Sequence, residues 1–339
     1  MSDWRVTIGS LTLNNPVLVA AGTFGYGTEF ARTVQLERLG ALITKTLTLQ
    51  PREGNPPPRL VETPSGMLNA VGLQNVGLDA FLHDKLPSLR AYRVPIIVSI
   101  LGESGEDVAV MVRRLDRADG VAAMELNLSC PNLQDRSGLK AQESAQGSRL
   151  KAQGSSLQPS AFSLQPKMVA QDPEATAAIV QAARRETAKP LVAKLSPDVT
   201  DLVPIAHAAV QAGADGLSLG NTFVGMSLDP VTRRSRLGML TGGLSGPAIR
   251  PLAVYRVWYT AQSISVPIIG LGGIVRAEDA LEFFLAGASA VAVGTANFAD
   301  PRAPLRVLHG LERYLRKHRI GSLAELRGTI NRTALKAEG

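Results

Sequence analysis

Residues 267–295 read PIIGLGGIVRAEDALEFFLAGASAVAVGT, which is one complete strand–helix–strand unit. Pro267 to Gly270 and Ala290 to Val293 are short apolar runs typical of buried strands. Ala277–Ala286 lies between them and has the apolar spacing of a helix, and acidic Glu278 and Asp279 in its first turn favour a helix start there. Two strands joined by a helix in this way run parallel.

The same alternation extends back through the chain and brings the number of apolar runs to eight. Eight parallel strands with crossover helices indicate a closed (β/α)8 barrel, an α/β fold. An open doubly wound sheet is the competing architecture, but no GxGxxG follows the first run. The other expected strands are Pro16–Ala21, Leu42–Thr46, Pro95–Leu101, Ala122–Leu128, Leu191–Leu195 and Gly216–Leu219, and the other expected helices are Glu106–Arg117, Pro173–Thr187, Leu202–Ala212 and Pro247–Gln262.

We expect residues 1–339 to form one barrel domain with additions at both ends. Trp4–Ile8 and Leu11–Leu13 resemble a short hairpin that could close the bottom of the barrel, and the tail after Pro301 resembles one or two closing helices.

Residues 133–171 are polar and repetitive: Ser137-Gly-Leu-Lys-Ala-Gln142 returns as Ser148-Arg-Leu-Lys-Ala-Gln153. Such a composition cannot bury a core, so it predicts an insertion after the fourth strand. A lid over the functional site is the alternative.

The composition excludes several classes of protein. One cysteine among 339 residues rules out an internal disulfide and an iron–sulfur cluster held by this chain alone, and we expect no metal site. No apolar run reaches the roughly 18 residues that a membrane span needs, and the start of the chain lacks a signal peptide, so we expect a cytoplasmic protein. The net charge of +7 suits an anionic substrate, a phosphate-bearing cofactor or RNA, or is a solvated surface.

Two lysines end predicted strands, where α/β barrels carry their reactive groups. Lys45 ends the second run and Lys194 the fifth. A buried ammonium group is costly unless it is paired, so each lysine needs an anionic partner. That partner is either an acidic side chain in a structural salt bridge or a bound ring and carboxylate.

Glycine-rich turns follow the last strands. Gly272-Gly273 and Gly294-Thr295 end the seventh and eighth runs, and Gly242-Gly-Leu-Ser-Gly246 precedes the helix that starts at Pro247. Any tight turn favours glycine. Three such turns in these places nevertheless predict a phosphate held by backbone N–H groups.

The lone Cys130 lies in a polar turn just past the fourth strand. A small hydrophobic core residue is one interpretation, but a core cysteine more often lies within an apolar run. We therefore favour a reactive thiol that transfers a proton. No histidine competes for this role, because all four fall in helical or tail segments, namely His83, His207, His309 and His318.

Five motifs carry a resemblance to a known family: Asn127-Leu-Ser-Cys-Pro-Asn132, Gly66-Met-Leu-Asn-Ala-Val-Gly-Leu-Gln-Asn75, Lys194-Leu-Ser-Pro197, Thr241-Gly-Gly-Leu-Ser-Gly-Pro247 and Ala290-Val-Ala-Val-Gly-Thr-Ala-Asn297. They are similar to the motifs of class 1 dihydroorotate dehydrogenases, and most similar to type 1B. The resemblance covers the chain from Leu13 to Pro301 except the insertion.

The resemblance implies an FMN-dependent oxidoreductase that converts dihydroorotate to orotate in pyrimidine biosynthesis. It implies that Cys130 removes the C5 proton while the C6 hydride passes to N5 of FMN. The implied substrate-binding residues are Lys45, Asn69, Ala70, Val71, Gly72, Leu73, Asn127, Asn132, Asn221 and Thr222. The implied flavin-binding residues are Ala21, Lys45, Thr46, Ser99, Asn127, Lys194, Gly220, Gly246, Gly272, Gly273, Gly294 and Thr295.

The chain departs from type 1B at two places. Ser99 stands where an asparagine is usual, which shortens one flavin contact, and the loop after Cys130 is much longer than a usual barrel loop.

The resemblance also implies a homodimer that pairs with an electron-transfer subunit carrying FAD and a 2Fe-2S cluster, with NAD+ as the acceptor. Without that partner, fumarate or a quinone is the alternative acceptor. Neither nucleic acid nor a membrane is expected as a partner.

Three other functions compete with this assignment. A tRNA-dihydrouridine synthase is also an FMN barrel with a loop cysteine, but the 66–75 motif does not fit it. A dihydropyrimidine dehydrogenase needs cysteine-rich segments that this chain lacks, although a separate subunit could provide them. An inactive flavin-binding scaffold, disabled by the insertion, would bind flavin without turnover.

Overall fold

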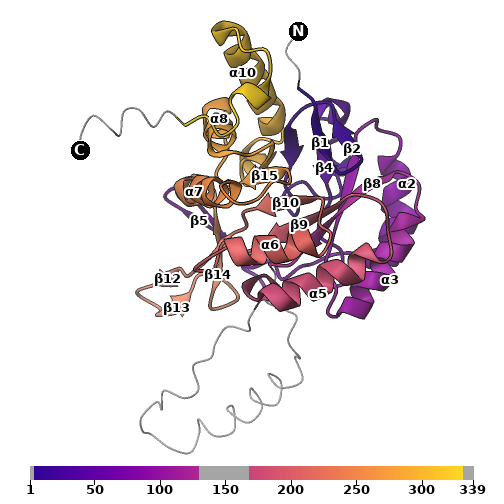
Figure 1. Ribbon diagram of the computed structural model, residues 1–339. Helices are drawn as coiled ribbons and strands as arrows, with labels where there is room; N and C mark the ends of the chain where they lie inside the picture. Colours follow the sequence, from indigo (N-terminus) through magenta and orange to yellow (C-terminus); the bar gives the residue numbers. More distant parts are fainter. Residues whose placement is uncertain (1–3, 130–167, 331–339) are drawn as a thin grey trace, which may run out of the picture.

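Eight buried strands close into a parallel barrel in the computed structural model, which describes residues 4–129 and 168–330 (Figure 1). Each strand pairs with the next in the chain, and the last pairs with the first, Val291 standing opposite Val17. The structure thus confirms the (β/α)8 TIM barrel and all eight expected strands. They are β3 (Val17–Val19), β4 (Ala41–Ile43), β7 (Ile96–Ile100), β8 (Val121–Asn127), β9 (Leu191–Leu195), β10 (Gly216–Leu219), β15 (Ile268–Leu271) and β16 (Ala290–Val293).

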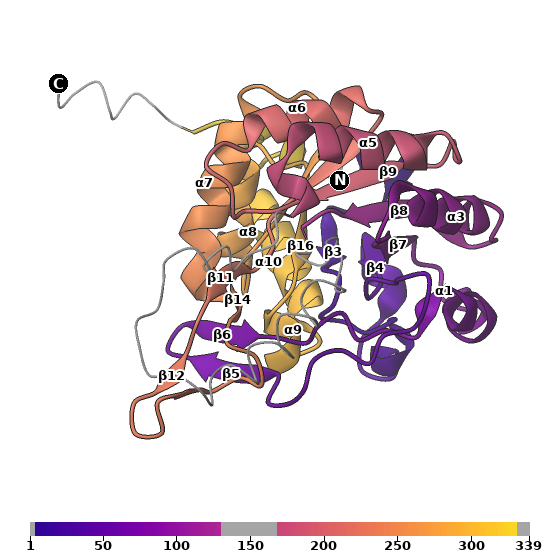
Figure 2. The same cartoon turned by 90° about the horizontal axis from the view of Figure 1, so that it is seen from below.

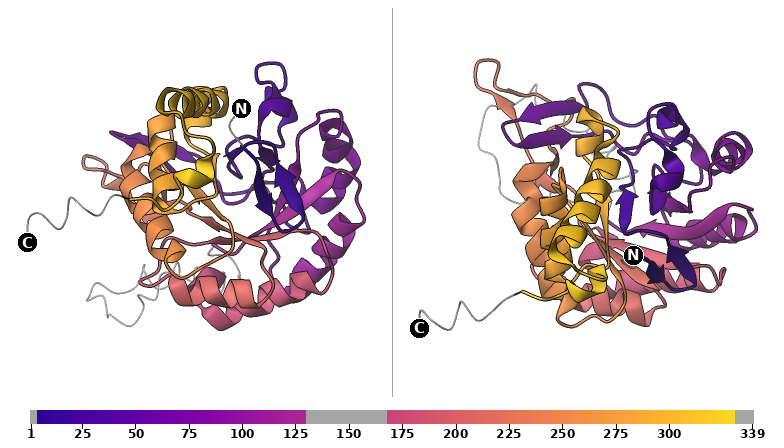
Figure 3. Two further views of the ribbon diagram at one scale, coloured as in Figure 1. Left: turned by 45° about the horizontal axis from the view of Figure 1, so that its top comes forward. Right: turned by 90° about the horizontal axis from the view of Figure 1, so that it is seen from above.

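Amphipathic helices surround this barrel (Figure 3). The principal ones are α3 (Gly105–Asp116), α5 (Pro173–Arg184), α6 (Val203–Gln211), α7 (Arg250–Ala261), α8 (Ala277–Ala286) and α10 (Ala303–His318). Acidic residues start two of them, and the sequence analysis expected this for α8. Asp172 Oδ1 accepts hydrogen bonds from the backbone of Glu174 and Ala175 at 2.9 and 3.1 Å at the start of α5. Asp279 accepts from the backbone N–H groups of Val275 and Arg276 before α8.

Shorter helical turns connect these elements. They are η1 (Thr28–Phe30), η2 (Leu36–Arg38), α1 (Gly77–Ala80), η3 (Phe81–Lys85), α2 (Leu86–Leu89), η5 (Val169–Gln171), η6 (Pro247–Ile249), α9 (Ala296–Ala299) and η7 (Leu323–Glu325). Within the described ranges, no helix is long and apolar enough to span a bilayer.

The predicted hairpin closes the bottom of the barrel. Strands β1 (Val6–Ile8) and β2 (Leu11–Leu13) pair antiparallel, and Ile8 and Leu13 are fully buried. They pack against inward-facing residues of the barrel such as Leu18, Ile43 and Ile97. The bottom is therefore filled by aliphatic side chains and has no access for water.

A second sheet lies at the opposite end, beyond the carboxyl ends of the strands (Figure 2). It is antiparallel, in the order β11 (Phe223–Gly225), β14 (Gly242–Ser245), β6 (Gly66–Asn69), β5 (Leu60–Thr63), with a two-stranded extension of β12 (Leu228–Asp229) and β13 (Arg234–Ser235). The sequence analysis did not predict it. Its strands come from the long excursions after β4 and β10.

The insertion was predicted over residues 133–171. Residues 133–167 of it lie outside the described residues. Its last four residues belong to the wall of the barrel. Met168 and Ala170 are buried, and the N–H of Ala170 donates to the carbonyl of Leu128 at 3.0 Å. The polar stretch therefore ends before Met168, since a buried turn needs the apolar side chains that begin there.

Candidate active site at the carboxyl ends of the strands

A chain of side-chain hydrogen bonds crosses the mouth of the barrel. The Thr46 hydroxyl lies 2.9 Å from Ser99 Oγ and accepts a hydrogen bond from Asn127 Nδ2 at 3.2 Å. Asn127 Oδ1 in turn accepts from Ser129 Oγ at 3.0 Å, and Ser129 Oγ accepts from Asn221 Nδ2. The network joins the ends of β4, β7, β8 and β10, so four predicted site residues are held in one cluster.

Ser129 was missed by the sequence analysis, although it lies inside one of the recognised motifs. It is buried and is the link between Asn127 and Asn221. Only the fold brings the ends of β8 and β10 together, and the sequence carries no signal for this bond.

Ser99, which we expected to contact flavin, lies behind Thr46. Its side chain is fully buried, its hydroxyl is bonded to Thr46, and its N–H donates to Thr44 Oγ1 at 3.2 Å. In this position Ser99 supports Thr46.

The two lysines stand close to this network and have no ion-pair partner among the described residues. Lys194 on β9 is aligned with Asn127 on β8 and is only 4% exposed. Neither Lys45 nor Lys194 forms an ion pair with any residue in the described ranges, so no salt bridge within those ranges accounts for them. Burial lowers the pKa of Lys45 from its ordinary value, and the charge of Arg59 lowers the pKa further. Two under-compensated cations at one place favour an anionic ligand.

Arg59 was also missed. It follows the stretch 56–58, and its guanidinium is held by the carbonyls of Asn55 and Glu53 and by Gln74 Oε1. Its charge reaches Lys45 only because the excursion after β4 folds back over the mouth.

The antiparallel sheet places the predicted substrate residues Asn69 and Thr222 together. Asn69 ends β6 and is aligned with Gly243 of β14, whose carbonyl accepts from Asn69 Nδ2 at 3.2 Å. Thr222 also lies against Gly243. A Cβ atom on residue 243 would lie only 2.0 Å from Thr222 Oγ1. Only glycine allows the two polar side chains to approach across this strand.

The predicted loop from Ala70 to Leu73 is held by backbone hydrogen bonds. Asn55 donates its N–H to the carbonyl of Val71 at 3.0 Å and its side-chain amide to the carbonyl of Ala70 at 3.1 Å. Gly72 and Leu73 both have positive φ, at 73° and 58°, which turns the chain sharply here. This strained turn is the kind of conformation that clusters at functional sites.

The three glycine-rich turns converge as expected for a phosphate site. A Cβ on Gly273 would lie 2.9 Å from the carbonyl of Gly246, and a Cβ on Gly246 would lie 3.6 Å from Thr295 Cγ2. Gly272, Gly273 and Gly294 donate no backbone hydrogen bond to another residue of the described ranges. Unpaired N–H groups gathered in one place are donors for an anionic group.

Other predicted residues line the same end. Gly22 follows Ala21, and no described atom lies within 4 Å of the position that its Cβ would take. A Cβ on Gly294 would have only Ala20 and Thr23 of the described residues within that distance. Gly220 follows β10 with φ of 134° and packs on the carbonyl of Leu271. A flat ring can lie against backbone that carries no side chains. Cys130 and Asn132 lie outside the described residues, directly after Ser129.

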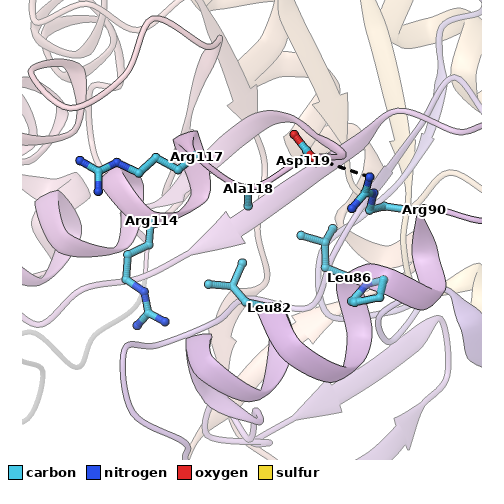
Figure 4. Close-up of a pocket in the computed structure, with 8 residues that line it drawn as sticks. Leu82, Leu86, Arg90, Arg114, Arg117, Ala118 and Asp119 are labelled. Atoms are coloured by element: carbon cyan, nitrogen blue, oxygen red, sulfur yellow. Dashed lines mark ion pairs between the residues drawn. The ribbon is translucent and has the colours of Figure 1, made fainter.

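Two hollows elsewhere contain none of the predicted site residues. One of about 300 Å³ lies on the outer surface between η3, α2 and the end of α3, over Leu82, Leu86 and Ala118 (Figure 4). Arg90 at its rim pairs with Asp119 at 3.7 Å. The other, about 490 Å³, lies beside α10. No cluster of three or more potential metal ligands occurs within residues 4–129 and 168–330.

Comparison with known proteins identifies a family. The family described as Dihydroorotate dehydrogenase matches residues 4–315. A protein of Desulforudis audaxviator is 50% identical over 97% of this chain and 97% of its own length. One from Geotalea daltonii is 49% identical over 97% of this chain and 98% of its own. Both are named dihydroorotate dehydrogenase B (NAD(+)), catalytic subunit.

Proposed function

Because this chain belongs to the dihydroorotate dehydrogenase family, we propose that it oxidises dihydroorotate to orotate at the barrel mouth, with FMN as hydride acceptor. One observation carries the proposal. Two lysines without acidic partners in the described ranges stand beside a network of amides and hydroxyls, at the end where barrel enzymes react. A ring rich in carbonyl and N–H groups with a carboxylate complements both features.

The residues fit FMN. The turns at Gly246, Gly273 and Thr295 would hold its phosphate, since these turns lie side by side and two of them carry glycine. Lys194 would face the electron-rich edge of the ring, and the open backbone at Gly22 and Gly294 leaves room for a flat ligand. When bound, FMN supplies the two-electron acceptor that no side chain of this protein can replace.

The substrate would be held by side-chain amides and by Lys45. Ser129 orients the side chains of Asn127 and Asn221, and the carbonyl of Gly243 orients that of Asn69. These amides therefore lose little conformational entropy when the substrate binds. A substrate carboxylate beside Lys45 would offset the burial and the Arg59 charge that lower its pKa. A site built from such groups rejects ligands that leave its amides unpaired.

We assign the proton transfer to Cys130, which directly follows Ser129 of this network in the chain. A thiol acts as base through its thiolate, which nearby positive charge favours. Lys45 and Lys194 supply such charge at the mouth.

The electron acceptor is proposed from the relatives. Their names specify NAD+ and describe a catalytic subunit, which supports a partner subunit in this protein as well. Since the chain has one cysteine, any 2Fe-2S cluster would belong to that partner. FAD on the partner is proposed from the resemblance to type 1B alone. We propose a homodimer of this chain with a partner on each copy, acting in the cytoplasm.

Anaerobic reduction of the purified protein by dihydroorotate tests the proposal at the flavin absorbance band. We expect rapid bleaching, which slows by about 10²–10⁴-fold in Cys130→Ala because a positioned base is lost. His207→Gln, on the outer helix α6, is the matched control and should bleach at the wild-type rate. A yellow protein that dihydroorotate cannot bleach would refute the assigned reaction, and bleaching by uracil-type substrates or activity on tRNA would favour the competing flavoenzymes.

A further inference from the structure

A buried carboxyl group lies inside the barrel just below the mouth, and nothing in the proposed reaction uses it. Glu125 on β8 is 1% exposed. Its Oε2 accepts a hydrogen bond from Ser218 Oγ at 2.9 Å. Its Oε1 is buried and has no hydrogen-bond partner among the described residues. An acidic side chain buried in this way is costly unless a positive charge stands nearby.

The strand register brings this carboxyl to the base of Lys194. Ser218 on β10 is aligned with Lys194 on β9, while Glu125 on β8 is aligned with Val192, two residues before Lys194. A side chain that extends from β8 to Ser218 on β10 must cross the strand between them. It does so at the level of Val192 and Lys194, whose side chains share the inner face of β9.

The two groups are complementary but do not touch. Lys194 is 4% exposed and forms no ion pair within the described ranges, so its nitrogen lies more than 4 Å from the Glu125 carboxyl. Lys194 lies two residues nearer the mouth than Val192, with which Glu125 is aligned, and Ser218 holds the carboxyl at 2.9 Å. The register therefore puts the carboxyl on the side of Lys194 that is farther from the mouth.

We propose that Glu125 is an ionised positioning residue that serves as the buried counter-charge of Lys194 and lowers the reduction potential of the bound flavin. The inference rests on the proposed binding of FMN at the mouth. Two-electron reduction makes the flavin edge more negative. Lys194 favours that state and the Glu125 carboxylate opposes it, since charges interact strongly in a buried, weakly polarisable site.

The test is the midpoint potential of bound FMN, measured by dye-coupled reduction without dihydroorotate. Glu125→Gln keeps the size of the side chain and removes its charge. We expect the ratio of reduced to oxidised affinity for FMN to rise about tenfold, which corresponds to a potential about 30 mV higher for a two-electron couple. Thr260→Val is the matched control, because its buried, unpartnered hydroxyl lies on α7 outside the barrel interior. That variant should leave the potential unchanged.

An unchanged or lower potential in Glu125→Gln would overturn the inference while leaving the proposed reaction intact. A merely structural role for Glu125 would lower thermal stability without moving the potential. If Glu125→Gln does not fold or the chain binds no FMN, infrared spectroscopy of the wild-type protein at neutral pH decides the matter. We expect no band from a protonated carboxyl group, and such a band would refute the ionised counter-charge.

Discussion

The two ends of the barrel are built on the same strands yet have opposite chemistry. On β7, Ile97 faces the apolar bottom and Ser99 faces the mouth; on β9, Val192 faces the bottom and Lys194 the mouth. Residues two apart in a strand share one face, so a single step along the barrel axis separates aliphatic packing from buried polar groups. The aliphatic side chains at the bottom stabilise the fold. The polar groups at the mouth cost free energy unless they bond to a ligand or to one another.

The difference makes cations at the mouth costly in the ligand-free protein. The hairpin residues Ile8 and Leu13 close the bottom completely, so water cannot reach the mouth from below. Electrostatic interactions in such a site are stronger than in water. Ile97→Ala perturbs the bottom alone, whereas substitutions of Lys45, Gly273 and Ser99 perturb the mouth and leave the bottom intact.

Ile97→Ala should have the largest effect, and on stability only. The side chain is fully buried in the aliphatic cluster at the bottom. Truncation leaves a cavity, and we expect the free energy of unfolding to fall by about 2–5 kcal/mol. Denaturant titration measures this loss. Turnover per folded molecule should stay at the wild-type value, and a parallel loss of turnover would show that the two ends are coupled.

Lys45→Met should show the reverse pattern. Loss of a charged hydrogen-bond donor to the substrate, about 1.5–3 kcal/mol, should slow bleaching by dihydroorotate about ten- to a hundredfold. The ligand-free protein should be at least as stable as wild type, because burial and Arg59 make the lysine charge unfavourable in the fold.

The same substitution gives a pH test. The pKa of Lys45 is lowered in the folded protein from its ordinary 10.5, so between these two values the unfolded chain binds more protons. The destabilisation by Lys45 is therefore complete below its folded-state pKa and disappears as the pH rises toward 10.5. Wild type should gain stability relative to Lys45→Met over that interval, and a constant difference across it would contradict the assigned cause.

Gly273→Ala should weaken FMN binding. Its φ is 73°, and a Cβ would lie 2.7 Å from Arg250 Cβ and 2.9 Å from the carbonyl of Gly246. An alanine at this positive φ costs about 1–3 kcal/mol of backbone strain, which displaces the turn that holds the phosphate. The FMN dissociation constant should therefore rise about tenfold. Gly105→Ala, where the nearest atom would be 3.6 Å away, is the control and should bind FMN normally. Fluorescence titration of the apoprotein distinguishes the two.

Ser99→Ala should have the smallest effect. The hydroxyl makes one hydrogen bond to Thr46, which keeps its bond from Asn127. We expect a loss of about 0.5–1.5 kcal/mol in stability and little change in FMN affinity. A large loss of FMN affinity would show that Ser99 contacts the flavin directly.

Much of the site could be predicted because functional residues stand next to strands that are easy to recognise. Lys45, Asn127 and Lys194 each end an apolar run, and the barrel makes all such ends meet. Glu125 escaped notice because it lies inside such a run, where only the register shows which way it faces. The β6–β14 pairing escaped as well, since it joins Asn69 to Gly243, 174 residues away.

The sequence by itself determined the eight-stranded barrel, the place of the mouth and the family, because strand runs, glycine turns and motifs are local patterns. Only the tertiary structure decided which side chains meet: Ser129 with Asn221, Thr222 with Gly243, and Glu125 with Ser218 beneath Lys194. These contacts depend on strand order and register, and those are set by packing between segments that lie far apart in the chain.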